Sequence, residues 1–209
     1  EFLGEGPVHL AYQQARLGDP RRTNAGLCEL LATLPLLNAP GERWGYGRST
    51  DVLGRVVEVV AGVPLGEFLR ERILGPLGMV DTNFHAEPDR HHRIAEPFPV
   101  DPDTGESVRL LDARRRPALE MGGGGLVSTA ADYPRFLQML LDGGRAGDRR
   151  FVSRKTVELM TADHLGPIAA DSPLLPPGYG FGLGFAVRTQ PGIAFTPGSV
   201  GQYYWSGIA

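Results

Sequence analysis

Helical periodicity dominates most of the chain and gives way to strand-like alternation near its end, and this order most constrains the fold. Apolar residues recur at helical spacing, as in the stripe Leu27, Leu30, Leu31 and Leu34. The predicted helices lie at 23–34, 49–61, 65–73, 130–141 and 154–160. Large and small side chains then alternate over 181–188, and an aromatic strand is expected over 202–208. Helices first and antiparallel-looking strands afterwards predict an α+β fold.

The same order predicts two regions. Residues 1–178 form a helical region with loops, and residues 179–209 begin the strands of an antiparallel sheet. Gly and Pro together make up 47 of the 209 residues, which indicates many loops. The chain begins at Glu1 rather than Met, and we expect it to be an internal piece of a longer protein.

Charge and cysteine content exclude several classes of function. The net charge of −3 does not suit sequence-independent binding of nucleic acid, which needs a basic field. The single cysteine, Cys28, permits neither an intrachain disulfide nor a cysteine-based zinc cluster. No apolar run reaches the length of a membrane span. Asp81, His85 and His91 lack a metal-ligand spacing, so neither a metal nor a cofactor is expected.

Three segments carry candidate chemistry, and each also has a packing interpretation. Tyr46 lies in a glycine-flanked loop before a helix, and a phenol is a weak base unless a cation lowers its pKa. Trp205 opens Trp-Ser-Gly in the aromatic strand. The glycines at 122–125 match no phosphate-binding motif and indicate positive φ or close backbone approach. Ser199 has Gly201 after it but Pro197 before it, so it does not form a nucleophile elbow.

Four segments, in this order, resemble the serine β-lactamase-like hydrolases, a group that includes class C β-lactamases, DD-peptidases and family VIII carboxylesterases. Residues 40–55 are similar to the family's tyrosine segment. Residues 64–82 are similar to a family segment that begins with Pro-Leu and ends with Pro-Leu-Gly-Met-x-Asp-Thr. Residues 122–132 resemble its Gly-Gly-Gly-Leu-x-Ser-Thr-Ala-x-Asp segment, and residues 179–207 the end of the catalytic domain. The resemblance implies a β-lactamase/transpeptidase-like fold, with a helical region inserted into an antiparallel sheet.

The resemblance also implies an acyl-enzyme mechanism, in which the serine of a Ser-x-x-Lys motif attacks a carbonyl. Tyr46 would be the base or proton relay. The substrate and oxyanion pocket would comprise Arg48, Gly124, Gly125, Trp205, Ser206, Gly207 and Ile208. The only lysine is Lys155, and Val152 stands three residues before it, so these residues contain no Ser-x-x-Lys. We expect the nucleophile to lie upstream of Glu1.

Two departures from the family pattern bear on the substrate. Arg48 replaces the asparagine of Tyr-x-Asn, and Trp205 replaces the cation of Lys/His-Thr-Gly. An indole in place of a cation favours a neutral ester over the carboxylate of a β-lactam, as in the family VIII esterases. Arg48 would restore some affinity for anions. The predicted function is a serine carboxylesterase. The alternatives are a β-lactamase or D-Ala-D-Ala peptidase, or a non-catalytic binding module. The expected partner is a small-molecule ester or β-lactam-like substrate.

Overall fold

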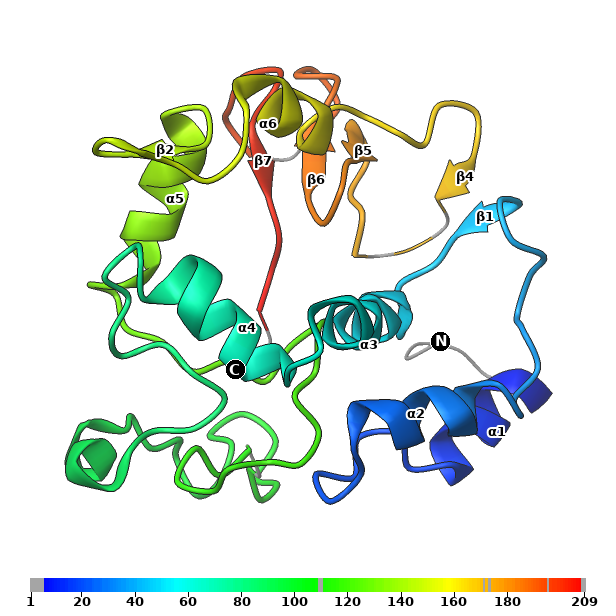
Figure 1. Cartoon of the computed structure of the whole chain (residues 1–209). Coiled ribbons are helices and arrows are strands. Elements are labelled where there is room, and N and C mark those ends of the chain that lie inside the picture. The colour runs from blue at the N-terminus through cyan, green and yellow to red at the C-terminus, as the bar shows by residue number, and fades with distance from the viewer. Residues whose placement is uncertain (1–5, 109–110, 171, 173, 195, 208–209) are drawn as a thin grey trace. The chain divides into compact units, whose positions relative to one another are not determined.

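The computed structural model describes residues 6–108, 111–170, 172, 174–194 and 196–207 (Figure 1). The described chain divides into two compact units. The first unit comprises residues 6–17, 29–48 and 136–207, and the second comprises residues 18–28 and 49–135. Among the described residues, no helix has the length and apolar character needed to cross a bilayer.

The first unit holds the strands. Its elements are α1 (Pro7–Gln14), β1 (Arg43–Trp44), β2 (Arg145–Ala146), β3 (Arg149–Arg150), α6 (Arg154–Met160), β4 (Ala169–Ala170), β5 (Tyr179–Phe181), β6 (Ala186–Arg188) and β7 (Tyr203–Tyr204). The last three form an antiparallel sheet with β6 in the middle. Strands β2 and β3 form a short antiparallel pair, and β1 pairs with β4 in parallel. The prediction of an α+β fold with antiparallel strands near the chain end is confirmed.

The single strand predicted over 181–188 is wrong. The chain turns between β5 and β6, and the two strands pair with each other, Phe181 opposite Ala186. Gly184 lies in this turn with φ +90°, a conformation that a strand does not use. Alternation of large residues with glycine is therefore compatible with a hairpin as well as with a strand. The aromatic strand expected over 202–208 is confined to Tyr203 and Tyr204 among the described residues.

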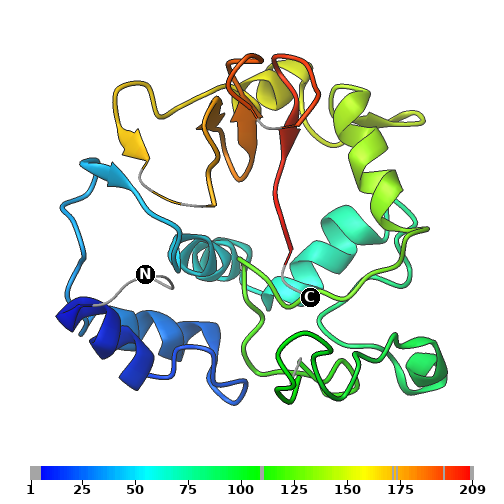
Figure 2. The same ribbon diagram turned by 180° about the vertical axis from the view of Figure 1, so that it is seen from behind.

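Helix α6 packs beside the three-stranded sheet, as both views show (Figures 1 and 2). Ser153 caps the helix by accepting a hydrogen bond from the backbone N–H of Thr156. At the other end, the backbone N–H of Leu183 donates to the carbonyl of Met160. Gly182 allows this approach, because a Cβ there would lie 2.2 Å from the Met160 oxygen.

A buried arginine fixes the loop between β6 and β7. The side chain of Arg188 is enclosed, with the residue 2% exposed. Its guanidinium donates to the carbonyl oxygens of Pro191 and Thr196 at 3.1 and 2.8 Å and to Gln202 Oε1 at 3.4 Å. These bonds tie the loop to the sheet just before β7. The chain therefore enters β7 from an anchored position.

The second unit holds most of the helices. It contains α3 (Ser49–Ala61), α4 (Leu65–Leu69), the π-helical turn η1 (Arg70–Leu74) and the 3-10 helix η2 (Pro88–Arg93). Helices α2 (Asn24–Leu31) and α5 (Tyr133–Leu141) each contribute residues to both units. The five predicted helices are therefore present, and three of them, α2, α4 and α5, are shorter as α-helices than predicted, with η1 continuing α4. The chain enters α5 through Thr129, whose Oγ1 accepts from the backbone N–H of Asp132.

A polar network joins the elements of the second unit. The side-chain amide of Asn24 donates to Glu58 Oε1 and to the backbone carbonyl of Glu120, each at 2.8 Å. The Glu120 carboxylate accepts from the backbone N–H of Gly66 at 2.7 Å. Asn24 and Glu120 are buried, so these bonds are shielded from water. The network links α2, α3 and the start of α4 to the segment before the glycine run.

Helix α3 buries an unexpected face. Gly54 packs so closely against the glycine run that a Cβ there would lie 3.1 Å from the Cα of Gly122. Asp51 is buried and accepts from the backbone N–H of Gly123 at 2.9 Å. Several large apolar side chains of the helix are exposed instead, with Leu53 57% and Val60 82% exposed. Small size and hydrogen bonding, rather than hydrophobicity, select the buried face of α3.

Candidate functional site

An aromatic cluster in the first unit brings the predicted tyrosine and tryptophan together. The ring centroids of Tyr46 and Trp205 lie 5.5 Å apart, with 44° between the ring planes. Trp44 lies 6.1 Å and Phe181 5.1 Å from the Trp205 ring, both edge-on. Trp44 and Phe181 also contact each other at 4.9 Å. All four side chains are half-buried, so the cluster remains partly open to solvent.

Two strand pairs carry the cluster. Tyr46 follows β1 by two residues, and β1 is held by parallel pairing, Trp44 opposite Ala170. Trp205 follows β7, the edge strand paired with β6. Because side chains two residues apart along an extended segment point to the same face, Trp44 and Tyr46 reach the same tryptophan. The Tyr46–Trp205 contact therefore joins segments that belong to two separate strand pairs.

Other predicted pocket residues in this unit flank the cluster. Arg48 lies two residues after Tyr46 and is half-buried. Ser206 and Gly207 directly follow Trp205, and both are exposed. Their exposed backbone would be accessible to a small molecule beside the indole. Ile208, predicted as an oxyanion donor, lies outside the described residues.

Gly124 and Gly125 belong to the second unit. Gly125 has φ +83°, and a Cβ there would meet the Met121 and Phe84 side chains. A Cβ on Gly124 would meet open space. Within the same run, a Cβ on Gly122 would lie 2.2 Å from the Thr50 carbonyl oxygen. The glycine run thus provides both positive φ and close backbone approach, as predicted.

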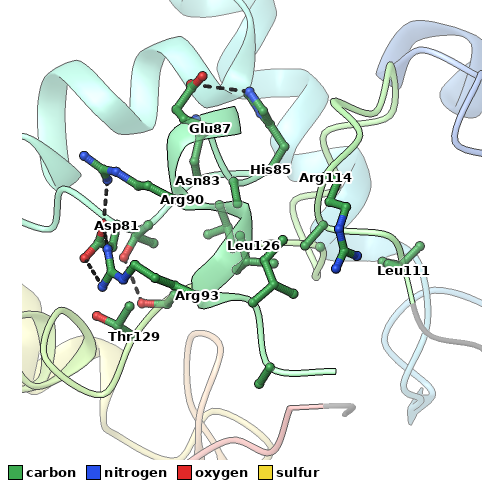
Figure 3. Close-up of a pocket in the computed structure, with 18 of the residues that line it drawn as sticks. Asp81, Asn83, His85, Glu87, Arg90, Arg93, Leu111, Arg114, Leu126 and Thr129 are labelled. Carbon is green, nitrogen blue, oxygen red and sulfur yellow. Dashed lines mark hydrogen bonds and ion pairs between the residues drawn. The ribbon is translucent and has the colours of Figure 1, made fainter. Parts of the chain in front are cut away.

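A cavity of about 1190 Å³ lies within the second unit, beside the segments 79–97 and 108–129 (Figure 3). Its lining carries equal numbers of basic and acidic side chains. Four arginines (Arg70, Arg90, Arg93 and Arg114) face it, and so do four carboxylates (Asp81, Glu87, Glu96 and Asp112). Arg114 pairs with Glu96 and Asp112. The lining is therefore mixed in charge, with no excess of one sign.

Asp81 is the most strongly paired acid of this cavity (Figure 3). Arg93 donates to both carboxylate oxygens at 2.8 Å, and Arg90 donates to Oδ1 at 2.6 Å. The hydrogen bonds from Arg93 hold the pKa of the Asp81 carboxyl below its ordinary value. Two guanidinium groups on one carboxylate leave it poorly suited to binding a cation. Among the described residues, no group of three or more His, Cys, Asp or Glu side chains could hold a metal ion.

The other two residues considered as metal ligands have separate roles. His85 Nε2 lies 3.4 Å from Glu87 Oε1, and His91 Nε2 lies 3.1 Å from the carbonyl oxygen of Ala86. Both contacts are local, within five residues along the chain. The histidines therefore stabilise the loop that carries them and η2.

Sequence reasoning missed Trp44 and Phe181 as members of the aromatic cluster. Trp44 could have been found, since it stands two residues before Tyr46 in a segment that pairs as a strand. Phe181 had no local signal, because its contact with Trp205 depends on how β5, β6 and β7 pair.

Comparison with known proteins agrees with the fold and the motifs. A family model described as Beta-lactamase matches residues 6–208. Protein Rv1367c of Mycobacterium tuberculosis is 36% identical over 99% of this chain and 53% of its own length. Lovastatin esterase of Penicillium rubens is 34% identical over 87% of this chain and 46% of its own length. The chain therefore belongs to the β-lactamase family.

A solved structure supports the same assignment. EstCE1, described as a hydrolase with promiscuous acyltransferase activity, superposes with a TM-score of 0.70 at 29% identity. The match covers 95% of this chain and 55% of that chain. The chain thus spans about half the length of the relatives that it matches.

Proposed function

We propose that the intact protein is a serine hydrolase that cleaves carboxylic esters through an acyl-enzyme intermediate. The observation that carries the proposal is the 5.5 Å distance between the ring centroids of Tyr46 and Trp205. Tyr46 stands where the family has its tyrosine, and Trp205 stands where the family has the cation of its Lys/His-Thr-Gly strand. Relatives named esterase support the same reaction class.

The mechanism assigns a proton-transfer role to Tyr46. A serine of a Ser-x-x-Lys motif, supplied outside these residues, attacks the ester carbonyl, and its proton passes to the Lys–Tyr46 pair. The alkoxide of the tetrahedral intermediate is stabilised by backbone N–H groups, one of them from the segment after Trp205. The proton then reaches the leaving alcohol, and water repeats the sequence to release the acid.

Trp205 directs substrate choice toward uncharged esters. The family's cation at this position pairs with a substrate carboxylate, and an indole instead presents an apolar face. Arg48, half-buried two residues from Tyr46, is a cation of the tyrosine segment that would favour an anionic substrate. A β-lactamase or D-Ala-D-Ala peptidase is therefore the second candidate.

A substrate panel on the intact protein distinguishes these functions. We expect p-nitrophenyl butyrate to be hydrolysed with a higher kcat/KM than a chromogenic cephalosporin or a D-Ala-D-Ala peptide, and a fluorophosphonate probe to label one serine. Faster turnover of the cephalosporin would favour the β-lactamase. A protein that is folded but neither labelled nor active would be a binding module, and the proposal would be wrong.

A further inference from the structure

Trp205 is the hub of the aromatic cluster, which we define as Trp44, Tyr46, Phe181 and Trp205. Its ring contacts each of the other three, and two of those contacts are edge-on, at 73° to Trp44 and 85° to Phe181. Edge-to-face packing is directional, because the positive ring edge meets the negative ring face. The orientation of the Trp205 indole is thus set from two sides.

Both edge-on partners of Trp205 lie within paired strands, whereas Trp205 lies one residue beyond a strand. Phe181 ends β5; its N–H donates to Asp163 Oδ1 at 3.1 Å, and its carbonyl accepts from the N–H of His164 at 2.9 Å. Trp44 is paired within β1. Trp205 instead follows the two-residue strand β7 and precedes the exposed residues Ser206 and Gly207.

We propose that Trp44 and Phe181 are positioning residues, which fix the indole of Trp205 and thereby set the acyl-chain preference of the site. The proposal rests on the proposed function, since it needs Trp205 to form a wall of the acyl pocket. Neither residue touches the reacting atoms. Their replacement should therefore change selectivity among acyl groups more than the rate for the smallest ester.

The kinetic test uses the intact enzyme and p-nitrophenyl acetate, butyrate and octanoate. In Trp44→Leu and Phe181→Leu, the ratio of kcat/KM between octanoate and acetate should change by about two- to tenfold, the factor for loss of one aromatic pair. Trp44→Phe and Phe181→Tyr keep a ring and should restore the ratio. Phe185→Leu is the matched control: Phe185 is equally half-buried in the same unit and packs on Tyr203 at 5.2 Å, outside the cluster.

A double-mutant cycle separates positioning from general loosening. In a Trp205→Leu background, Phe181→Leu should leave the ratio unchanged within about twofold, because the group that it positions is gone. Equal effects of Phe181→Leu with and without Trp205 would overturn the proposal. So would an effect of Phe185→Leu as large as that of Phe181→Leu.

A fluorescence measurement distinguishes failure of the positioning role from failure of the proposed esterase function. Acrylamide quenching of the tryptophan fluorescence is measured for each protein with and without Trp205→Phe. The difference between the two measurements is the contribution of Trp205. Phe181→Leu should raise this quenching and Phe185→Leu should not. If no ester is hydrolysed but the quenching responds, the function is wrong and the positioning role stands. If esters are hydrolysed while quenching and selectivity stay unchanged, the positioning role is wrong.

Discussion

Tyr46 combines two properties in one side chain, a ring that packs and a hydroxyl that can carry a proton. The ring packs against Trp205, and the hydroxyl is the group that the proposed mechanism needs. The two can be separated experimentally, because phenylalanine keeps the ring.

We expect Tyr46→Phe to lower kcat by about 10²- to 10⁴-fold, as for loss of a general base, with little change in melting temperature. Steady-state kinetics with p-nitrophenyl butyrate measure this directly. Tyr203→Phe is the control, since Tyr203 is another half-buried tyrosine of the same unit, whose pKa is raised by burial. Full activity in Tyr46→Phe would rule out proton transfer by this hydroxyl.

Asp81 gives a prediction about pH. The hydrogen bonds from Arg93 lower the pKa of its carboxyl in the folded state, so the unfolded state binds the proton more readily. The stabilisation is therefore complete above about pH 4, the unfolded value, and is lost as the pH falls through the lower folded pKa.

Asp81→Asn should have a lower melting temperature than the wild type at pH 7, and the two melting curves should converge as the pH falls below about 4. Thermal melts across this range test the expectation. A difference that stays constant with pH would show that the carboxylate charge is not what stabilises the loop.

At the scale of elements, the contact between α3 and the glycine run depends on the absence of side chains. Gly54 and Gly122 face each other, and the Thr50 carbonyl oxygen lies where a Cβ of residue 122 would be. This backbone oxygen cannot shift without a free-energy cost, because the hydrogen bonds of the helix hold it in place.

Gly122→Ala should reduce the free energy of unfolding by about 1–3 kcal/mol through this steric conflict. Gly124→Ala is the matched control two residues away, where a Cβ meets nothing within 4 Å. Gly124→Ala should change the free energy of unfolding by less than about 1 kcal/mol. A gain in stability is also compatible, because alanine restricts the unfolded chain. Urea unfolding measures both, and equal losses would contradict the role of the close approach.

Local signals were sufficient for some elements and insufficient for others. The bounds of α3 follow from residues within the helix and beside it, a polar start at Ser49 and Gly62 with φ +71° after the last turn. The hairpin of β5 and β6 was not predicted, because the turn at Gly184 interrupts an alternation that continues on both sides. Which face of α3 is buried depends on the distant glycine run, and no pattern within the helix reveals it.

The same division applies to the site. Tyr46 and Trp205 were predicted from motifs that resemble a family, and their proximity needed the structure. Phe181 joins them only through strand pairing. The family resemblance identified Tyr46 and Trp205, whereas only the contacts between segments show that they form one cluster.

At the scale of the whole molecule, the exposed stripe of α3 bears on how these 209 residues behave by themselves. Leu53, Val56, Val59 and Val60 lie on one face and are each at least 50% exposed. A net charge of −3 gives little repulsion between copies. Contiguous exposed apolar side chains favour association in water.

Val56→Lys should reduce concentration-dependent association of this chain, whereas Val200→Lys should not. Val200 is an exposed valine of similar accessibility, 62% against 50%, so both variants add the same charge at a solvent-facing site. Sedimentation velocity over a range of concentrations measures the difference. Equal behaviour of the two variants would exclude the stripe as the association surface.

The exposed valines of α3 also predict how self-association of the chain depends on temperature. Attraction between apolar side chains weakens on cooling, because it is driven by the entropy of the water released. Chilled solutions of the chain should therefore stay clear where warmed ones turn cloudy, well below the temperature at which either unit melts.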